Sequence, residues 1–301
     1  MREINHLIFS GGGIRGLTFI GIIKKLQELI KLRKHLELQD NFDSTLCKIP
    51  LIDIKSICSV SAGSLISLMY LIGYTYIDML TIVLSKNFVD LKDIKIIDFL
   101  SKYGLDTGDK IISWLKELML NKNVNENITM IELYNKTNVK LQIMATNLNR
   151  YKLKNFNHED TPDVKVLDAI RMSISIPLVF VPKEYQGEIY VDGCLMNNYP
   201  IEMFDNNLEN VLGFKVITNG EMEIDIVNHN ISDIQSYIHN IFNCYIVQNE
   251  KHTTRNEKYK ACTVYIHTKE LSSSLNFNLT PLQRNQLIQV GYNAIDSFFN
   301  I

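Results

Sequence analysis

The sequence predicts a single α/β domain in which helices flank a mainly parallel central sheet, and three observations point to this class. Short apolar runs typical of strands alternate along the chain with longer segments of helical periodicity. Hydrophobic residues make up 46% and charged residues 21% of the 301 residues, a composition that can bury a core and is not that of a disordered protein. No repeat, low-complexity tract or Pro/Gly/Ser-rich linker divides the chain. Alternating strands and helices favour parallel pairing, because parallel strands need long crossovers.

The first quarter of the chain predicts two strand–loop–helix units. A short apolar strand at 5–10 leads into a run of glycines, and 17–38 follows as an amphipathic helix. After a polar connection at 39–48, a second strand at 54–59 turns sharply into an apolar helix that extends to about Ile72.

The remaining elements continue the alternation. Residues 94–120 are predicted to be helical with a glycine-containing break at 103–109, and a helix that starts near Val166 must end before Pro177. Four further strands are predicted at 141–146, 188–191, Val211–Ile217 and 262–267.

The whole chain, 1–301, is expected to form one domain. Its core is predicted over 5–217 and its C-terminal part over 218–301, within which the polar segment 219–260 is a candidate lid or insertion. The closing helix is Pro281–Phe299, with the preceding threonine as its N-cap and the proline at its first position.

Charge and cysteine content exclude several classes of protein. The formal net charge is −2 with no long run of one sign, so an electrostatically recognised nucleic acid is not expected. Five cysteines without a C-x-x-C pair are typical of reduced thiols in a cytosol-like compartment. The N-terminus has no signal-peptide pattern, and the uncharged stretch 56–77 favours a buried strand and helix over a membrane span. We expect a soluble, cytoplasmic protein.

A glycine loop, Gly11-Gly12-Gly13-Ile14-Arg15-Gly16, lies between the first strand and the first helix. Such a loop turns tightly and presents backbone N–H groups to an anion at a helix N-terminus. The same letters satisfy G-x-G-x-x-G, so a dinucleotide site is one alternative, and a turn without a ligand is another. The dinucleotide site requires an acidic residue at the end of the next strand, whereas Glu37 and Asp40 lie at a charged helix end.

A second motif, Ser59-Val60-Ser61-Ala62-Gly63, lies at the next strand-to-helix junction. A nucleophile elbow needs small residues on both sides of its serine, and Ser59, which replaces the first glycine of G-x-S-x-G, is small. The alternative is an ordinary helix start with Ser61 as N-cap.

A third motif is the pair Asp192-Gly193, which follows the strand predicted at 188–191. Alone, Asp-Gly indicates a turn. Beside a serine nucleophile, however, an aspartate within hydrogen-bond reach of the hydroxyl can act as the base without a histidine.

Together and in this order, the three motifs resemble the patatin-like phospholipase family. The opening LIFSGGGIRGLTFIGIIKKL, the block DAIRMSISIPLVFVP at 168–182 and the ending LTPLQRNQLIQVGYNAIDSFF are all similar to that family. The resemblance implies a three-layer α/β/α fold and a lipid acyl hydrolase that works through a Ser–Asp dyad and an acyl-enzyme.

The resemblance also implies roles for individual residues and for partners. Ser61 would be the nucleophile, Asp192 its base, and Gly11, Gly12 and Gly13 the oxyanion-hole loop. Supporting motif positions are Arg15, Gly16, Ser59, Gly63 and Gly193. Two positions depart from the family pattern: Ser59, where glycine is usual, and Cys194, where a smaller residue follows Asp-Gly. The implied substrate is a phospholipid or other acyl lipid met at a membrane surface, with no metal and no cofactor.

Three other functions remain open from the sequence. An α/β-hydrolase triad would add one of the histidines that follow Asp192, namely His229, His239, His252 and His267. A nucleotide-dependent oxidoreductase would use the glycine loop alone, and a non-catalytic relative would keep only lipid binding. The apolar run at 176–182 has three possible places: an acyl groove, a membrane contact or the core.

Overall fold

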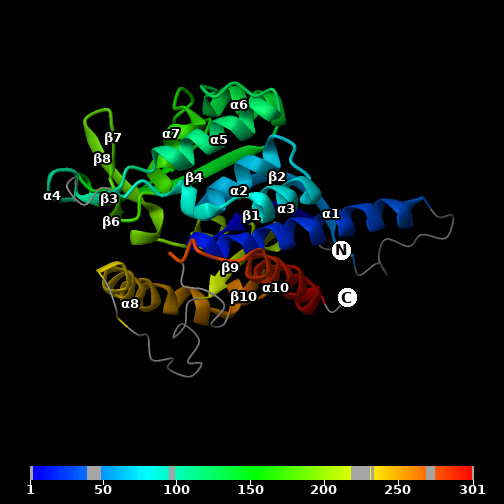
Figure 1. Ribbon diagram of the computed structural model, residues 1–301. Coiled ribbons are helices and arrows are strands. Elements are labelled where there is room, and N and C mark those ends of the chain that lie inside the picture. The colour runs from blue at the N-terminus through cyan, green and yellow to red at the C-terminus, as the bar shows by residue number, and fades with distance from the viewer. Residues whose placement is uncertain are drawn as a thin grey trace.

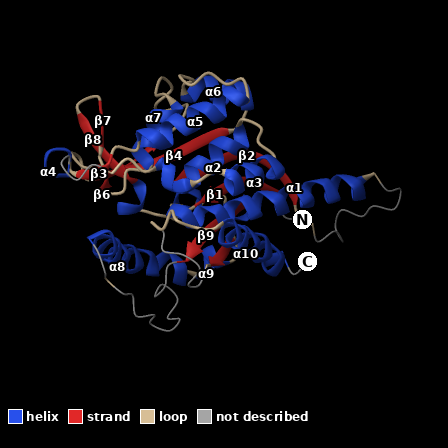
Figure 2. Ribbon diagram, in the orientation of Figure 1, coloured by secondary structure: helices blue, strands red, loops and turns tan. Residues whose placement is uncertain are grey.

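The computed structural model of the chain describes residues 3–38, 49–94, 99–217, 231, 234–268 and 275–299. A central sheet runs through the molecule with helices packed around it, and the chain begins and ends on the same side (Figures 1 and 2). The prediction of a single α/β fold with a helix-flanked central sheet is confirmed.

The sheet has the strand order β10-β9-β1-β2-β4-β8-β7, with β5 paired to β4. Five of its strands pair in parallel: β1 (Glu3–Phe9), β2 (Leu51–Val60), β4 (Lys140–Asn147), β9 (Val211–Ile217) and β10 (Thr263–His267). The three strands at the other edge pair antiparallel: β5 (Lys152–Phe156), β7 (Lys183–Tyr185) and β8 (Glu188–Asp192). A separate parallel pair is formed by β3 (Gly104–Asp106) and β6 (Leu178–Phe180).

Ten α-helices occur in the described residues: α1 (Thr18–Glu37), α2 (Ala62–Leu71), α3 (Tyr76–Ser85), α4 (Phe99–Lys102), α5 (Asp109–Asn121), α6 (Met130–Thr137), α7 (Val166–Ser173), α8 (Ile234–Arg255), α9 (Glu257–Lys260) and α10 (Pro281–Phe299). The large apolar core lies between the sheet and α1, α2, α5, α7 and α10. A smaller core covers the opposite face, where the segment 199–211 and α9 pack on β1, β2 and β4. Helices α1 and α10 lie side by side (Figure 1).

The register of the parallel strands brings two loops together. Phe9 at the end of β1 pairs with Ser59 near the end of β2, so the glycine loop and the serine motif leave the sheet at the same edge. In open α/β sheets, ligands bind outside the carboxyl ends of the strands.

Most predicted elements are confirmed, and one predicted break between helices contains a short strand. Residues 94–120 were expected to be helical with a break at 103–109, and in the described part of this range α4 and α5 lie on either side of that break, which contains the strand β3. The strand forms because its backbone lies against β6, so closely that a Cβ on Gly104 would lie 2.3 Å from the Val181 nitrogen. Such a pairing between distant segments overrides local helical preference.

Two helices that the sequence analysis did not predict carry a visible start signal. Helix α3 begins with a capping box between Thr75 and Asp78, and α6 with one between Thr129 and Glu132. The pattern Ser/Thr-x-x-Asp/Glu before an apolar run is a sequence-level sign of a helix start.

Two further expectations concern the connecting segments. The polar connection at 39–48 lies outside the described residues, as does most of 219–233. The rest of the candidate lid or insertion contains α8 and α9, and α8 packs against β6 and the turn at Gly193–Leu195. Residues 56–77 contain parts of β2 and α3 and all of α2. No helix in the described part of the chain is long and apolar enough to cross a membrane.

Candidate active site

Ser61 occupies the sharp turn between β2 and α2. Its backbone has φ 51° and ψ −123°, a left-handed conformation that is costly for a residue with a side chain. The turn is held by hydrogen bonds: the Ser61 N–H donates to Ser173 Oγ at 2.9 Å, and its carbonyl accepts from both the N–H and the hydroxyl of Ser64. Ser61 occupies the N-cap position of α2, but its side chain forms no capping hydrogen bond with that helix.

The Ser61 hydroxyl points instead at Asp192, the last residue of β8. Ser61 Oγ donates to Asp192 Oδ2 at 2.5 Å, and the Cys194 N–H donates to Asp192 Oδ1 at 2.9 Å. The Asp192 backbone is fixed on both sides, because its carbonyl accepts from Thr146 Oγ1 and its N–H donates to the Ser175 carbonyl. Residues separated by 131 positions therefore meet in one hydrogen-bonded pair.

Burial sets the electrostatics of this pair. The Asp192 side chain is completely buried, and the loss of water raises its pKa from 3.8 to about 6. Hydrogen bonds from the Ser61 hydroxyl and from the N–H and thiol of Cys194 oppose this rise, because they stabilise the carboxylate. A carboxylate whose pKa lies close to neutral is a stronger base than an exposed aspartate and is still ionised at pH 7.

The glycine loop lies next to Ser61, and its three amides differ. Gly11 donates its N–H to the Asn198 carbonyl at 3.2 Å, whereas the Gly12 and Gly13 N–H groups form no hydrogen bond within the described residues. A Cβ on Gly11 would lie 2.2 Å from Asn198 Oδ1 and 3.3 Å from the Ser61 Cβ, so a larger residue there would have to displace the Asn198 side chain. The loop thus leaves two amides, not three, available to an anion beside Ser61.

The other motif positions act in the backbone framework. A Cβ on Gly63 would lie 2.7 Å from the Phe9 carbonyl oxygen, so this glycine lets α2 approach β1. A Cβ on Gly16 would lie 2.8 Å from the Ala62 Cβ, and a Cβ on Gly193 would lie 2.6 Å from the Met144 carbonyl oxygen. These contacts are packing contacts.

Both departures from the family pattern are accommodated. Ser59 is buried in β2, and its hydroxyl donates to the Gln142 carbonyl of β4 at 3.3 Å. Cys194 places its N–H and its thiol beside the Asp192 carboxylate. A serine and a cysteine thus occupy these positions with hydrogen-bonding roles.

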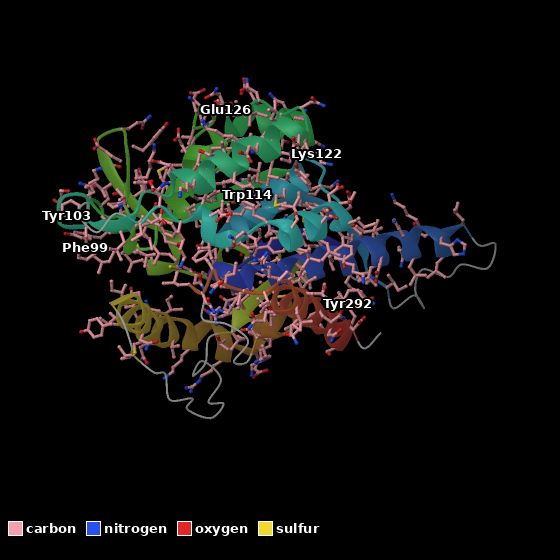
Figure 3. The ribbon with its side chains drawn as sticks, viewed as in Figure 1. Phe99, Tyr103, Trp114, Lys122, Glu126 and Tyr292 are labelled. Carbon is pink, nitrogen blue, oxygen red and sulfur yellow. The ribbon has the colours of Figure 1, made fainter. Side chains whose placement is uncertain are left out.

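An apolar pocket opens beside Ser61. Its volume is about 780 Å³ including the mouth, and Gly13, Ser61 and Ala62 form part of its wall. The rest of the wall is apolar and comes from α2, α3, α5 and segments near 88–91, 174–180 and 275–277. Trp114 of α5 lies in this wall, in the interior of the molecule (Figure 3).

Ser173 and Thr146 were not singled out from the sequence. Ser173 Oγ accepts from the Ser61 N–H and donates to the Met144 carbonyl of β4, so it ties the elbow to the sheet. Ser173 lies in the block at 168–182, but nothing in the local pattern distinguishes it from Ser175. Its role depends on contacts between strands that are distant in the sequence.

The competing sites have less support. Glu37 ends α1 in an ion pair with Arg33 and does not follow a strand, and Asp40 lies outside the described residues. Arg15 is buried and donates to the Ile217 carbonyl of β9. His267 is exposed at the end of β10, whereas His229 and the side chains of His239 and His252 lie outside what is described. Among the described residues, no group of three or more His, Cys, Asp or Glu side chains could hold a metal ion.

Comparisons with known proteins agree with this geometry. The family model described as patatin-like phospholipase matches residues 7–205. The probable lipid hydrolase 463L of Invertebrate iridescent virus 6 is 30% identical over 207 residues, which cover 65% of this chain and 62% of that protein. The uncharacterized protein R571 of Acanthamoeba polyphaga mimivirus is 29% identical over 308 residues, which cover 97% of this chain and 93% of the relative.

A solved structure shares the fold. The crystal structure of VipD from Legionella pneumophila superposes with a TM-score of 0.56 at 19% sequence identity. The superposition covers 99% of this chain and 67% of VipD.

Proposed function

The chain belongs to the patatin-like phospholipase family, and on that premise we propose that it hydrolyses carboxylic esters of acyl lipids with Ser61 as nucleophile and Asp192 as base. The observation that carries the proposal is the 2.5 Å hydrogen bond from Ser61 Oγ to Asp192 Oδ2 at the wall of an apolar pocket. A nucleophile, a buried base and a site for an acyl chain are thus adjacent.

The first half of the proposed reaction forms an acyl-enzyme. Ser61 Oγ attacks the ester carbonyl carbon while its proton moves to Asp192 Oδ2, and the negative charge develops on the carbonyl oxygen. The N–H groups of Gly12 and Gly13 would receive this oxyanion, because they are free of other partners within the described residues. Preorganised donors of this kind supply a large part of the stabilisation in acyl transfer. The intermediate then collapses, and the leaving alkoxide takes the proton from Asp192.

The second half releases the acid. A water molecule gives a proton to Asp192 as its oxygen attacks the acyl carbon. The tetrahedral intermediate collapses, the bond to Ser61 Oγ breaks, and the proton held by Asp192 returns to the serine. Ser61 and Asp192 are restored, and no metal or cofactor takes part in the proposed cycle.

The small sheet β3–β6 supports contact with a lipid surface. Leu178 is 41% exposed and Tyr103 is 64% exposed, and both have positive φ angles, 65° and 61°. Leu178 of β6 pairs with Gly104 of β3, and Tyr103 immediately precedes β3 at the outer edge of the molecule (Figure 3). Such conformations cost on the order of 1–2 kcal/mol per residue. We infer that these side chains face the acyl-lipid phase, with the protein bound peripherally.

Covalent labelling tests the proposed nucleophile. A fluorophosphonate should add once to the intact protein, at Ser61, because the base and the free amides activate this hydroxyl alone. Ser61→Ala should remove the adduct, and Ser85→Ala, at an exposed serine at the end of α3, should keep it. A folded protein that is not labelled, or is labelled at another serine, would contradict the proposal and favour a relative that only binds lipid.

A further inference from the structure

The apolar pocket has a wall that comes from outside the family-matched region. The match ends at residue 205, whereas Leu275 and Phe277 contribute to the pocket that Ser61 borders. Both side chains are partly buried and pack against the main core. The C-terminal part of this chain therefore completes the site that the proposed function uses.

Phe277 lies between two hollows. A second pocket, with a volume of about 420 Å³ including open space, extends toward Ile94 and Asp106 beside the small sheet β3–β6. Five residues border both pockets: Leu91, Ile111, Phe180, Leu275 and Phe277. A residue that lines two neighbouring hollows separates them, so the side chains of this set limit how far an acyl chain extends from Ser61.

Helix α10 fixes this partition through a buried arginine. Arg284 donates from Nη1 to the carbonyls of Val83, at 2.9 Å, and of Lys86, at the end of α3. Its guanidinium lies 4.9 Å from the centre of the Phe88 ring, and that ring meets Trp114 edge-on at 6.1 Å. Val83, Phe88 and Trp114 all line the first pocket. Arg284 thus joins α10, just after Phe277, to the opposite wall.

We propose that Leu275, Phe277 and Arg284 set the acyl-chain length that this enzyme accepts, with the Phe277 ring at the boundary between the two pockets and Arg284 as a positioning residue for the pocket wall. The proposal rests on the proposed function, because it assumes that the acyl chain of the substrate enters this pocket. Removal of the Phe277 ring would enlarge the opening between the two pockets, which Leu91, Ile111, Phe180 and Leu275 also border, and would give a longer acyl chain more room toward β3–β6.

The first test compares chain lengths in turnover. Phe277→Ala should raise the ratio of kcat/KM for a p-nitrophenyl palmitate to that for the octanoate, in the same mixed micelles, by roughly tenfold, since single methylenes in apolar pockets change selectivity by such factors. Arg284→Lys, which loses the planar fork, should change the same ratio by a smaller factor. Leu282→Ala is the matched control, because Leu282 is exposed on the same helix. An unchanged ratio in a folded Phe277→Ala protein would overturn the proposal, and Phe277→Leu replaces it if the alanine variant does not fold.

The second test does not depend on hydrolysis. Trp114 is the only tryptophan in the chain and lines the pocket, so bromine-labelled fatty acids that enter should quench its fluorescence. In a Ser61→Ala background, Phe277→Ala should lower the ratio of the dissociation constant of the long acid to that of the short acid by roughly tenfold. If the wild-type protein hydrolyses no ester but this shift occurs, the proposed function is wrong, and the selection of acyl-chain length by the pocket is supported. If esters are hydrolysed but no acid quenches Trp114, the acyl chain does not enter this pocket, and the proposed selection of chain length is wrong.

Discussion

Asp192 illustrates how a single residue of this site lowers the stability of the fold. Its carboxylate is completely buried, and the pKa rises from 3.8 to about 6 because burial penalises the charged form. This loss of folding stability is absent below pH 3.8, grows between pH 3.8 and about 6, and is complete above about pH 6. At neutral pH the folded protein therefore carries a charge that an asparagine would avoid.

Asp192→Asn should consequently stabilise the protein at pH 8. The difference between 3.8 and about 6 corresponds to a gain on the order of 3 kcal/mol, which should shrink below pH 5, where the wild-type carboxyl is already protonated in the folded state. Urea unfolding at the two pH values measures this. Asp163→Asn, at an exposed position, is the control and should show no such pH dependence. A loss of stability in Asp192→Asn at pH 8 would contradict the burial argument.

The pH dependence of turnover reports the same residue. Because Asp192 must be ionised to accept a proton, kcat/KM on a soluble ester should rise with pH and reach half of its plateau near the Asp192 pKa of about 6.

Cys194 should affect the pH at which kcat/KM rises, which is the acid limb of the pH profile. Its thiol stabilises the carboxylate and lowers the pKa of Asp192, so Cys194→Ala should move the limb to higher pH, while Cys194→Ser, which keeps a donor, should restore it. A limb that stays in place in the alanine variant would exclude the thiol as a contributor.

At the residue scale, the sequence indicated which residues form the candidate site but not the hydrogen bonds that hold them. The strand–serine–helix pattern was enough to expect a strained turn at Ser61. It was not enough to assign Ser173 as the residue that holds the turn, or to see that Gly11 gives its N–H to Asn198. Both contacts join segments that are more than 100 positions apart.

At the scale of elements, the run at 176–182 combines the places that the sequence left open. Ile176 and Phe180 line the apolar pocket, while Leu178 between them faces outward from β6. Two-residue alternation would place all three side chains on one face, but the backbone turns here: Leu178 has a φ of 65°, and the N–H groups of Val179 and Phe180 both donate to the Ile176 carbonyl. The segment therefore borders the acyl site on one side and, in our proposal, the lipid surface on the other.

Leu178→Ser and Phe180→Ser should separate these two faces. Leu178→Ser should lower the hydrolysis of liposomes relative to that of a soluble short ester, because it removes an exposed apolar contact. Phe180→Ser should lower the melting temperature as well, since truncation of a buried phenylalanine costs about 3–5 kcal/mol. Liposome flotation, ester turnover and thermal unfolding of both variants check this. Equal losses from both substitutions would assign Leu178 to the core.

Prediction of the elements depended on how local their determinants are. Helices α1 and α10 and the strand β9 follow from periodicity and caps, and the capping boxes of α3 and α6 are also local signals. The strand β3 is not local, because its three residues are extended only through pairing with β6. The antiparallel edge formed by β7 and β8 likewise depends on where β8 meets β4.

At the scale of the whole molecule, strand order assembles the site. The glycine loop follows β1, Ser61 follows β2 and Asp192 ends β8, and both β2 and β8 pair with β4. The chain order of the three motifs predicted their association through the family resemblance. The sequence did not predict the strand order itself, nor that residues near 275 would return to line the pocket.

The most direct test of the account is turnover of a soluble ester by Ser61→Ala, Asp192→Asn and the double variant. Each single substitution should lower kcat by several orders of magnitude, and the double variant should be no worse than either, because the two residues act as one unit. His239→Ala and His252→Ala, measured beside them, should keep turnover within about threefold of wild type, an effect below about 1 kcal/mol. Near-normal turnover in Asp192→Asn, together with its loss in a histidine variant, would contradict the dyad and establish a triad in its place.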